Sequence, residues 1–145
     1  MAPLVHALSL VWANLRAQHQ LFWTYHWRAK GRPYYGDHLL FQRLYEARVL
    51  EIDRVAEVLM AIGGSDAVDP LRSWEAVKAT IDATVRQPGT DVQQSVALVN
   101  DTLRKLEAAN DQVNATAYPL AVNNVLAGIA DKQLEALYLL KQRGA

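Results

Sequence analysis

The sequence predicts an all-α fold, a bundle of four long helices with one short crossover helix between the second and the third. Apolar residues recur at intervals of three, four or seven residues along most of the chain, which is the period of amphipathic helices. The strict alternation of apolar and polar residues that marks half-buried strands is absent. Breaks that contain glycine or proline separate the helical segments, at Gly31 and Pro33, Gly63 and Gly64, and Pro88 and Gly89. The 145 residues are enough for a single domain spanning 1–145.

Two long helices are expected in the first half, at residues 3–29 and 35–62. The apolar stripe of the first comprises Leu4, Leu8, Val11, Leu15, Phe22 and His26. The buried side of the second comprises Phe41, Leu44, Tyr45, Ile52, Val55, Leu59 and Ile62. Gly31 and Pro33 break the pattern between them, and Gly63 and Gly64 end the second helix. The two helices should therefore form an antiparallel hairpin.

The second half is expected to hold the short helix and the other two long helices. Ser73 is the expected N-cap of the short helix at 73–84, which Pro88 and Gly89 stop. Its apolar face comprises Trp74, Val77 and Ile81. Asp91 opens the third long helix, whose apolar residues are Val92, Val96, Val99, Leu103, Leu106 and Val113. Pro119 begins the fourth, which carries Leu120, Leu126, Ile129, Leu134 and Leu137.

Composition argues against several classes of protein. Lys and Arg together number 15, as do Asp and Glu, so the formal net charge is zero and no general basic field attracts nucleic acid. The sequence has no lysine-rich tail either, so we expect weak or absent DNA binding. It contains no cysteine, which excludes disulfides and thiolate metal sites. No apolar run suits a signal peptide or a membrane span, so we expect a cytoplasmic protein without a membrane partner.

Four side chains of metal-ligand type lie on the predicted hairpin: His26, His38, Asp53 and Glu57. Counted outward from the turn, His26 falls roughly opposite His38, so the two imidazoles can approach each other. Asp53 and Glu57 follow His38 by fifteen and nineteen residues on the same helix. At about 1.5 Å of rise per residue, they lie roughly 22 to 28 Å from His38 along the axis. The four side chains cannot share one metal within a single subunit whose second helix is straight.

A second copy of the chain would complete the site. At about 100° per residue, one arc of the second helix carries His38, Gln42, Glu46, Val49, Asp53 and Glu57. If two copies of that helix pack antiparallel about a two-fold axis near Glu46, His38 of one copy meets the two carboxylates of the other. Imidazole and carboxylate together suit Fe(II), with open positions for an oxidant. The alternative is that the histidines are ordinary helix residues and the acids form a solvated face.

The stretch HWRAKGRPYYGDHLLFQRLYEARVLEIDRVAEVLMAIGG, from His26 to Gly64, resembles the DNA-protection-during-starvation (Dps) family of mini-ferritins. The resemblance lies in the His-Trp start, the Lys-Gly turn, the second His, the Asp-x-x-x-Glu pair and the closing Gly-Gly. It implies a ferritin-like four-helix bundle whose ferroxidase centre lies between two subunits. In that centre Glu57 would bridge two irons, His26 and Asp53 would complete one iron position, and His38 the other. It also implies Fe(II) oxidation, with hydrogen peroxide as the expected oxidant, and protective storage of Fe(III) in a dodecameric shell.

The sequence departs from the family at Gln42, where an acidic residue usually stands four positions after the second His. An amide is a poorer iron ligand than a carboxylate, so this iron position should be weaker, with Asp37 and Glu46 as candidate replacements. Trp27, directly after His26, is a candidate radical trap, although aromatic packing explains it as well. Two further interpretations stay open: a Dps-like shell with impaired iron chemistry, and a di-metal oxidase that stores no iron.

Overall fold

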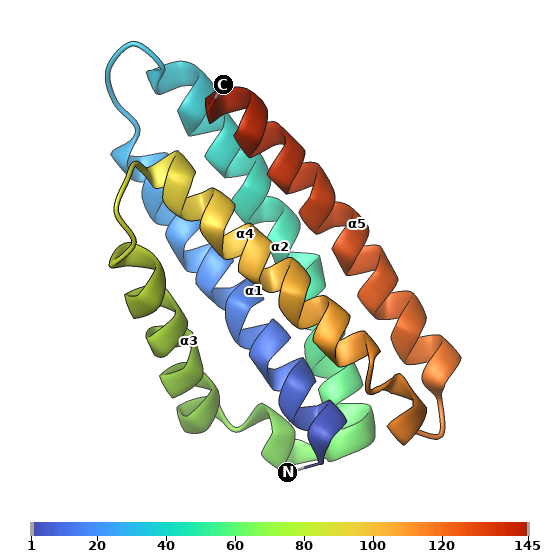
Figure 1. Cartoon of the computed structure of the whole chain (residues 1–145). Helices are drawn as coiled ribbons and strands as arrows, with labels where there is room; N and C mark the ends of the chain where they lie inside the picture. The colour runs from blue at the N-terminus through green and yellow to red at the C-terminus, as the bar shows by residue number, and fades with distance from the viewer. Residues whose placement is uncertain (1, 145) are drawn as a thin grey trace.

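The computed structural model describes residues 2–144 and confirms the all-α fold. Its helices are α1 (Pro3–Arg28), α2 (Tyr34–Gly63), α3 (Pro70–Val85), α4 (Asp91–Asn110) and α5 (Pro119–Gly144), with two short 3₁₀ segments, η1 (Ser65–Val68) and η2 (Val113–Ala115). No strand occurs in this part of the chain. Figure 1 shows α1, α2, α4 and α5 side by side as a four-helix bundle, while α3 lies outside it along α1. Within residues 2–144, no helix has the length and apolar character needed to cross a bilayer.

The apolar stripes of the long helices meet in two clusters along the bundle axis. The cluster nearer the start of α1 includes Leu8, Val11, Leu15, Val55, Leu59, Leu106 and Leu126. The cluster nearer the α1–α2 turn includes Phe22, Tyr25, Phe41, Val99, Leu137 and Leu140. Full burial of each large apolar side chain contributes about 1.5–3 kcal/mol to the stability of the fold. Burial of these two clusters, more than intrinsic helix propensity, therefore holds the helices together.

The turn between α1 and α2 sets the relative position of the two histidines. Gly31 has a φ of 78°, a left-handed conformation that glycine adopts without steric strain. Its carbonyl oxygen accepts a hydrogen bond from the main-chain N–H of Tyr34 at 3.1 Å, which closes the turn. The helix α2 then runs back along α1. The predicted hairpin is confirmed, and the ends of its helices differ from the expected ones by a single residue.

The short helix begins earlier than the sequence pattern indicated. Its N-cap is Asp69 and not Ser73, because Asp69 Oδ1 accepts a hydrogen bond from the main-chain N–H of Arg72 at 2.7 Å. Pro70 occupies the first helical position, where no N–H is needed. Ser73 lies inside α3, and its hydroxyl accepts a hydrogen bond from Arg16 Nη1 of α1 at 2.9 Å. A carboxylate cap followed by proline is the stronger start signal, so α3 is longer than predicted.

The helices α4 and α5 begin at the predicted residues, but several apolar assignments need correction. Val113 lies beyond the end of α4, in η2. Leu134, expected in the stripe of α5, is 59% exposed, because five residues beyond Ile129 rotate it about 140° from the buried side. Leu120 in the first turn of α5 and Trp74 on α3 are also exposed. These side chains are available for contacts outside the single bundle.

Candidate metal centre

His26 of α1 and His38 of α2 lie face to face. Their ring centroids are 3.7 Å apart and their planes differ by 19°. His26 is only 9% exposed, and His38 is half-buried beside it. Twelve residues separate them in the chain, and the tight turn brings them together across the hairpin. The structure therefore places two candidate metal ligands in contact.

Each imidazole ring is held by the main chain of the opposite helix. His26 Nδ1 donates to the carbonyl oxygen of His38 at 2.7 Å, and His38 Nδ1 donates to the carbonyl oxygen of His26 at 2.9 Å. A carbonyl oxygen can only accept, so the hydrogen lies on Nδ1 in both rings. In the neutral imidazole the lone pair is then on Nε2, which is available to bind a metal. A hydrogen bond from the second ring nitrogen orients a ligand and raises its basicity, and both histidines have one.

Asp53 and Glu57 lie far from the imidazoles of their own chain. Because α2 is one uninterrupted helix, its rise separates Asp53 from His38 by about 22 Å. Both acids are exposed, and Glu57 has a loose ion pair with Arg54 at 3.9 Å. Across residues 2–144, no three His, Cys, Asp or Glu side chains gather closely enough to hold a metal. A single subunit thus carries two imidazoles at one end of α2 and two carboxylates towards the other.

The candidate second-site residues Gln42, Glu46 and Asp37 are held in different ways. Gln42 Nε2 donates to Glu46 Oε1 at 3.1 Å, along the face of α2 that carries the second imidazole. Asp37 forms a two-pronged ion pair with Arg143 of α5, whose Nη2 lies 3.0 Å from Asp37 Oδ2. The hydrogen bond to Asp37 raises the pKa of Arg143 above its ordinary value. An iron contact by Asp37 would require this ion pair to open. Glu46 lies eight residues from His38, about 12 Å along α2, so it is the more distant of the two candidates.

Sequence comparison gives one distant relative. General stress protein 20U of Bacillus subtilis (strain 168) is 26% identical to the chain over 113 residues, which covers 76% of this chain and 78% of that protein. No protein-family model matches the chain.

Comparison with solved structures identifies the fold. Dps from Thermosynechococcus elongatus has a TM-score of 0.82 at 16% identity, covering 98% of this chain and 90% of that one. DpsC from Streptomyces coelicolor has a TM-score of 0.82 at 21% identity, covering 98% and 83%. A DPS protein from Vibrio cholerae O1, described as a member of a broad superfamily of ferritin-like diiron-carboxylate proteins, has a TM-score of 0.80 at 16% identity, covering 98% and 89%. The chain has the ferritin-like fold of the Dps proteins. The four-helix bundle with a short crossover helix, as predicted, is this Dps-type bundle.

Aromatic side chains of the Dps-type bundle extend from the imidazoles to the surface. Tyr45 lies edge-on to His26, with ring centroids 5.5 Å apart. Trp23 stacks on Tyr45 at 5.2 Å with an interplanar angle of 12°, and Trp27 lies 5.1 Å from Trp23. Trp27 itself is 60% exposed. The ring contacts thus connect Trp27 to His26 through Trp23 and Tyr45.

A buried polar layer crosses the middle of the Dps-type bundle. Arg48 and Glu51 of α2 form an ion pair and are 1% and 7% exposed. Arg48 Nη1 donates to Gln18 Oε1 of α1 at 3.1 Å, and Gln18 Nε2 donates to Gln133 Oε1 of α5 at 2.7 Å. Gln18 Nε2 also donates to Thr102 Oγ1 of α4 at 2.8 Å. All four bundle helices are therefore joined by one hydrogen-bond network.

Sequence reasoning missed this layer, although a signal was present. Arg48 follows Leu44 by four residues and precedes Val55 by seven, so it is in register with the buried stripe of α2. Burial raises the pKa of Glu51, and the neighbouring guanidinium opposes that rise. Ferritin-type di-iron sites inside one bundle use several carboxylates and Glu-x-x-His pairs. This layer offers one carboxylate, already paired with Arg48, so its donor set does not suit two irons.

Proposed function

We propose that this chain is a Dps-like mini-ferritin subunit that oxidises Fe(II) at sites shared between two copies and stores Fe(III) in a hollow shell. The observation that carries the proposal is the His26–His38 pair, in which both Nδ1 atoms are bound by carbonyl oxygens and both Nε2 atoms can bind metal. The fold likeness to a protein described as a ferritin-like diiron-carboxylate protein supports iron as the metal. A two-fold dimer, a dodecameric shell and a cytoplasmic location belong to the same proposal.

The outer face of α2 suits the second copy that the shared site requires. Val49 and Met60 are 52% and 46% exposed and lie in the same arc of α2 as Asp53. Trp74 of α3 lines a shallow pocket together with Val49 and is 48% exposed. Exposed apolar side chains that gather on one face mark subunit contacts. Two α2 helices packed antiparallel about an axis near Glu46 would cover these side chains and bring the carboxylates of one copy to the imidazoles of the other.

Each part of the shared site would have a distinct role. His26 Nε2 and Asp53 would hold one Fe(II), His38 Nε2 would hold the other, and Glu57 would bridge them. Each Fe(II) gives up one electron, and hydrogen peroxide takes up both as its O–O bond breaks, leaving two Fe(III) ions and water or hydroxide. Because the two electrons are supplied together, no hydroxyl radical is released, which protects the cell from oxidative damage.

Trp27 would act when only one iron is bound. One Fe(II) supplies one electron, so the reduction of peroxide is incomplete unless a second donor is within reach. An indole is readily oxidised, and the ring contacts through Trp23 and Tyr45 connect Trp27 to His26. Trp27 would supply the second electron and hold the resulting radical at the protein surface.

Mixing two inactive variants tests the shared site. Assemblies of His26→Ala or of Asp53→Ala should each be inactive, because every site lacks one ligand. In a random mixture, half of the dimers pair one variant with the other, and each such dimer has one intact and one doubly defective site. Peroxide-dependent Fe(II) oxidation, followed by the absorbance of Fe(III), should therefore recover to about a quarter of the unmodified rate.

A matched mixture provides the control. His26→Ala and His38→Ala remove ligands from the same half of the site, so no mixed dimer has an intact site and no activity should return. Native mass spectrometry verifies that mixed dimers form. If verified mixed dimers of His26→Ala and Asp53→Ala stay inactive, the shared site is wrong.

Iron loading distinguishes storage from the two alternatives. Loading far above the number of binding sites indicates storage. Loading that stops at the sites indicates a di-metal oxidase, and absence of loading indicates a shell with impaired iron chemistry. Gln42 supports the last alternative, a shell with impaired iron chemistry. An amide stands there in place of the expected carboxylate, and it donates a hydrogen bond to Glu46.

A further inference from the structure

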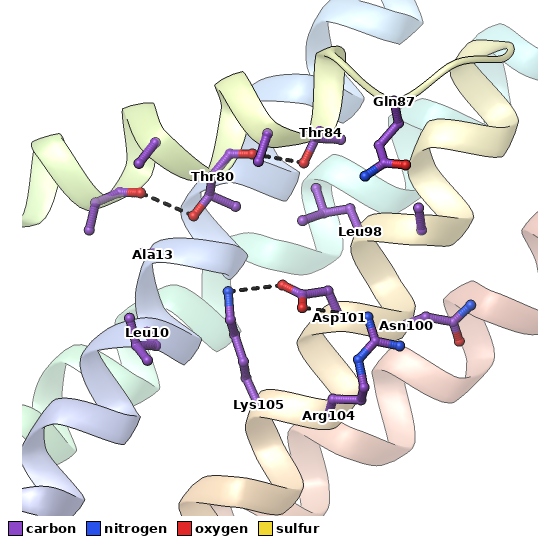
Figure 2. Close-up of a pocket in the computed structure, with 14 residues that line it drawn as sticks. Leu10, Ala13, Thr80, Thr84, Gln87, Leu98, Asn100, Asp101, Arg104 and Lys105 are labelled. Carbon is purple, nitrogen blue, oxygen red and sulfur yellow. Dashed lines mark hydrogen bonds and ion pairs between the residues drawn. The ribbon is translucent and has the colours of Figure 1, made fainter.

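A groove lies between α3 and α4 and shares no residue with the candidate metal centre. Its volume is about 690 Å³, within the range of small-molecule sites. Leu10 and Ala13 of α1 form its floor together with Leu98 of α4. Figure 2 shows α3 along one side of the groove and α4 along the other, with their side chains facing each other across it.

The α3 wall of the groove is apolar. Ala76, Ala79 and Ala83 recur at three and four residues and so lie on one face of the helix. Thr80 and Thr84 lie on the same wall, and their hydroxyls donate to the carbonyl oxygens of Ala76 and Thr80 at 3.0 and 2.8 Å. These hydroxyl hydrogens are used within α3. The wall therefore offers an occupant mainly methyl groups, with the amide of Gln87 just beyond the end of α3.

The α4 wall carries two cations, Arg104 and Lys105, and one carboxylate, Asp101. Lys105 Nζ donates to Asp101 Oδ2 and to Asn14 Oδ1, both at 2.9 Å. Asn14 Nδ2 also donates to Asp101 Oδ2 at 2.9 Å. Burial favours protonation of Asp101, but the hydrogen bonds from Lys105 and Asn14 outweigh it and lower its pKa, so the carboxylate is ionised. Asp101 and Lys105 thus neutralise each other.

Arg104 is the cation that remains. Its Nη2 lies 3.5 Å from Asp101 Oδ1, which is long for an ion pair, and its side chain is 70% exposed. A guanidinium offers two parallel N–H groups that match the two oxygens of a carboxylate. Figure 2 shows Arg104 at the α4 side of the groove, next to Asn100 and Asp101. The groove therefore combines a methyl-lined wall with one incompletely paired cation.

We propose that the α3–α4 groove binds a small amphipathic carboxylate, with its aliphatic body against the alanine wall and its carboxylate on Arg104. Burial of the ligand's hydrocarbon against the alanine wall favours binding, and the guanidinium of Arg104 favours an anionic head group. A ligand with a cationic head would meet Arg104 and be repelled. A ligand without charge would bury the same hydrocarbon but leave the guanidinium with only its 3.5 Å contact to Asp101.

Three probes of equal chain length separate the two contributions. Octanoate, octanol and octylammonium carry the same aliphatic body with an anionic, a neutral and a cationic head group. Isothermal titration of the assembled protein, at low ionic strength, should show octanoate binding about tenfold more tightly than octanol. Octylammonium should bind more weakly than octanol.

Two pairs of variants test the two walls. Ala79→Leu fills the groove and should abolish octanoate binding, whereas Ala108→Leu on the exposed face of α4 outside the groove should not change it. Arg104→Gln should weaken octanoate binding about tenfold and leave octanol unchanged. Arg86→Gln is its control, since the Arg86 side chain is similarly exposed (76% against 70%), is also paired with an aspartate four residues earlier, and does not line the groove.

The outcomes decide the proposal independently of iron oxidation. Equal affinity for octanoate and octylammonium would overturn it, as would full binding by Ala79→Leu. Absence of octanoate binding in the unmodified protein would also overturn it. If, in addition, Ala79→Leu lost its assembly in sedimentation velocity, the groove would be a contact between copies of the chain instead.

Discussion

Removal of the buried guanidinium of Arg48 should destabilise the bundle strongly. Arg48 is 1% exposed, forms the ion pair with Glu51, and donates a hydrogen bond to Gln18. Arg48→Met keeps a long apolar side chain but leaves Glu51, which is only 7% exposed, without its counter-ion. Breaking a buried ion pair from one side costs about 3–5 kcal/mol, and we expect a loss of this size in the free energy of unfolding at pH 8. Urea denaturation followed by circular dichroism measures it.

The loss should depend on pH, and its direction follows from Glu51. Burial raises the pKa of this carboxyl, and Arg48 lowers it; without Arg48 the pKa in the folded state rises further above the ordinary 4.5. A raised folded-state pKa means that the folded protein holds the proton more tightly than the unfolded chain. The free energy of unfolding of Arg48→Met is therefore highest below the pKa that Glu51 has in the unfolded chain. It falls as the pH rises towards the pKa of Glu51 in the folded protein, by up to about 1.4 kcal/mol per pH unit. Arg48→Met should be least harmful near pH 4.5.

Two further variants test whether the unpaired charge is the cause. Arg48→Met combined with Glu51→Leu removes both charges and should recover most of the stability, because apolar replacement of a buried ion pair is often neutral or favourable. Arg86→Met breaks an exposed pair with Asp82 and should change the free energy of unfolding by less than about 1 kcal/mol. A loss for Arg48→Met that is constant between pH 5 and 8, or a double variant as unstable as the single one, would refute this reasoning.

Four other outcomes are expected. Gln42→Asp should tighten the second Fe(II) binding step about tenfold in anaerobic calorimetry, because a carboxylate replaces an amide; two equal, tight steps in the unmodified protein would contradict this. Trp27→Phe should increase spin-trapped hydroxyl radical when Fe(II) is limiting, and an unchanged signal would assign Trp27 to packing alone. Duplex DNA should not be retained in a gel-shift at low salt and neutral pH, because the net charge is zero. Tyr25 should ionise with a pKa of about 12 in an ultraviolet titration, since burial and the charge of Asp91 raise it, and ionisation near pH 10 would contradict its buried position.

Local features of the chain were predictable because they depend on residues that are close in sequence. The turn at Gly31 and Pro33 follows from backbone geometry, and it places His26 opposite His38 without any distant contact. The separation of Asp53 from the imidazoles follows from the rise of one uninterrupted helix. One local prediction that failed was the start of α3, where the Asp69–Pro70 signal was present but Ser73 was preferred.

The sequence alone determined the helical fold, the hairpin and the spacing of the candidate ligands, whereas tertiary packing decided how their surroundings are arranged. Asp37 is held by Arg143, which lies 106 residues away, and Gln18 meets Gln133 across 115 residues. Neither contact has a local signature, because it depends on how α5 packs against the hairpin. The groove between α3 and α4 likewise exists only because the crossover helix lies against α1 and leaves its alanine face beside α4. Helix periodicity fixes which side chains share a face, but only packing decides which faces meet.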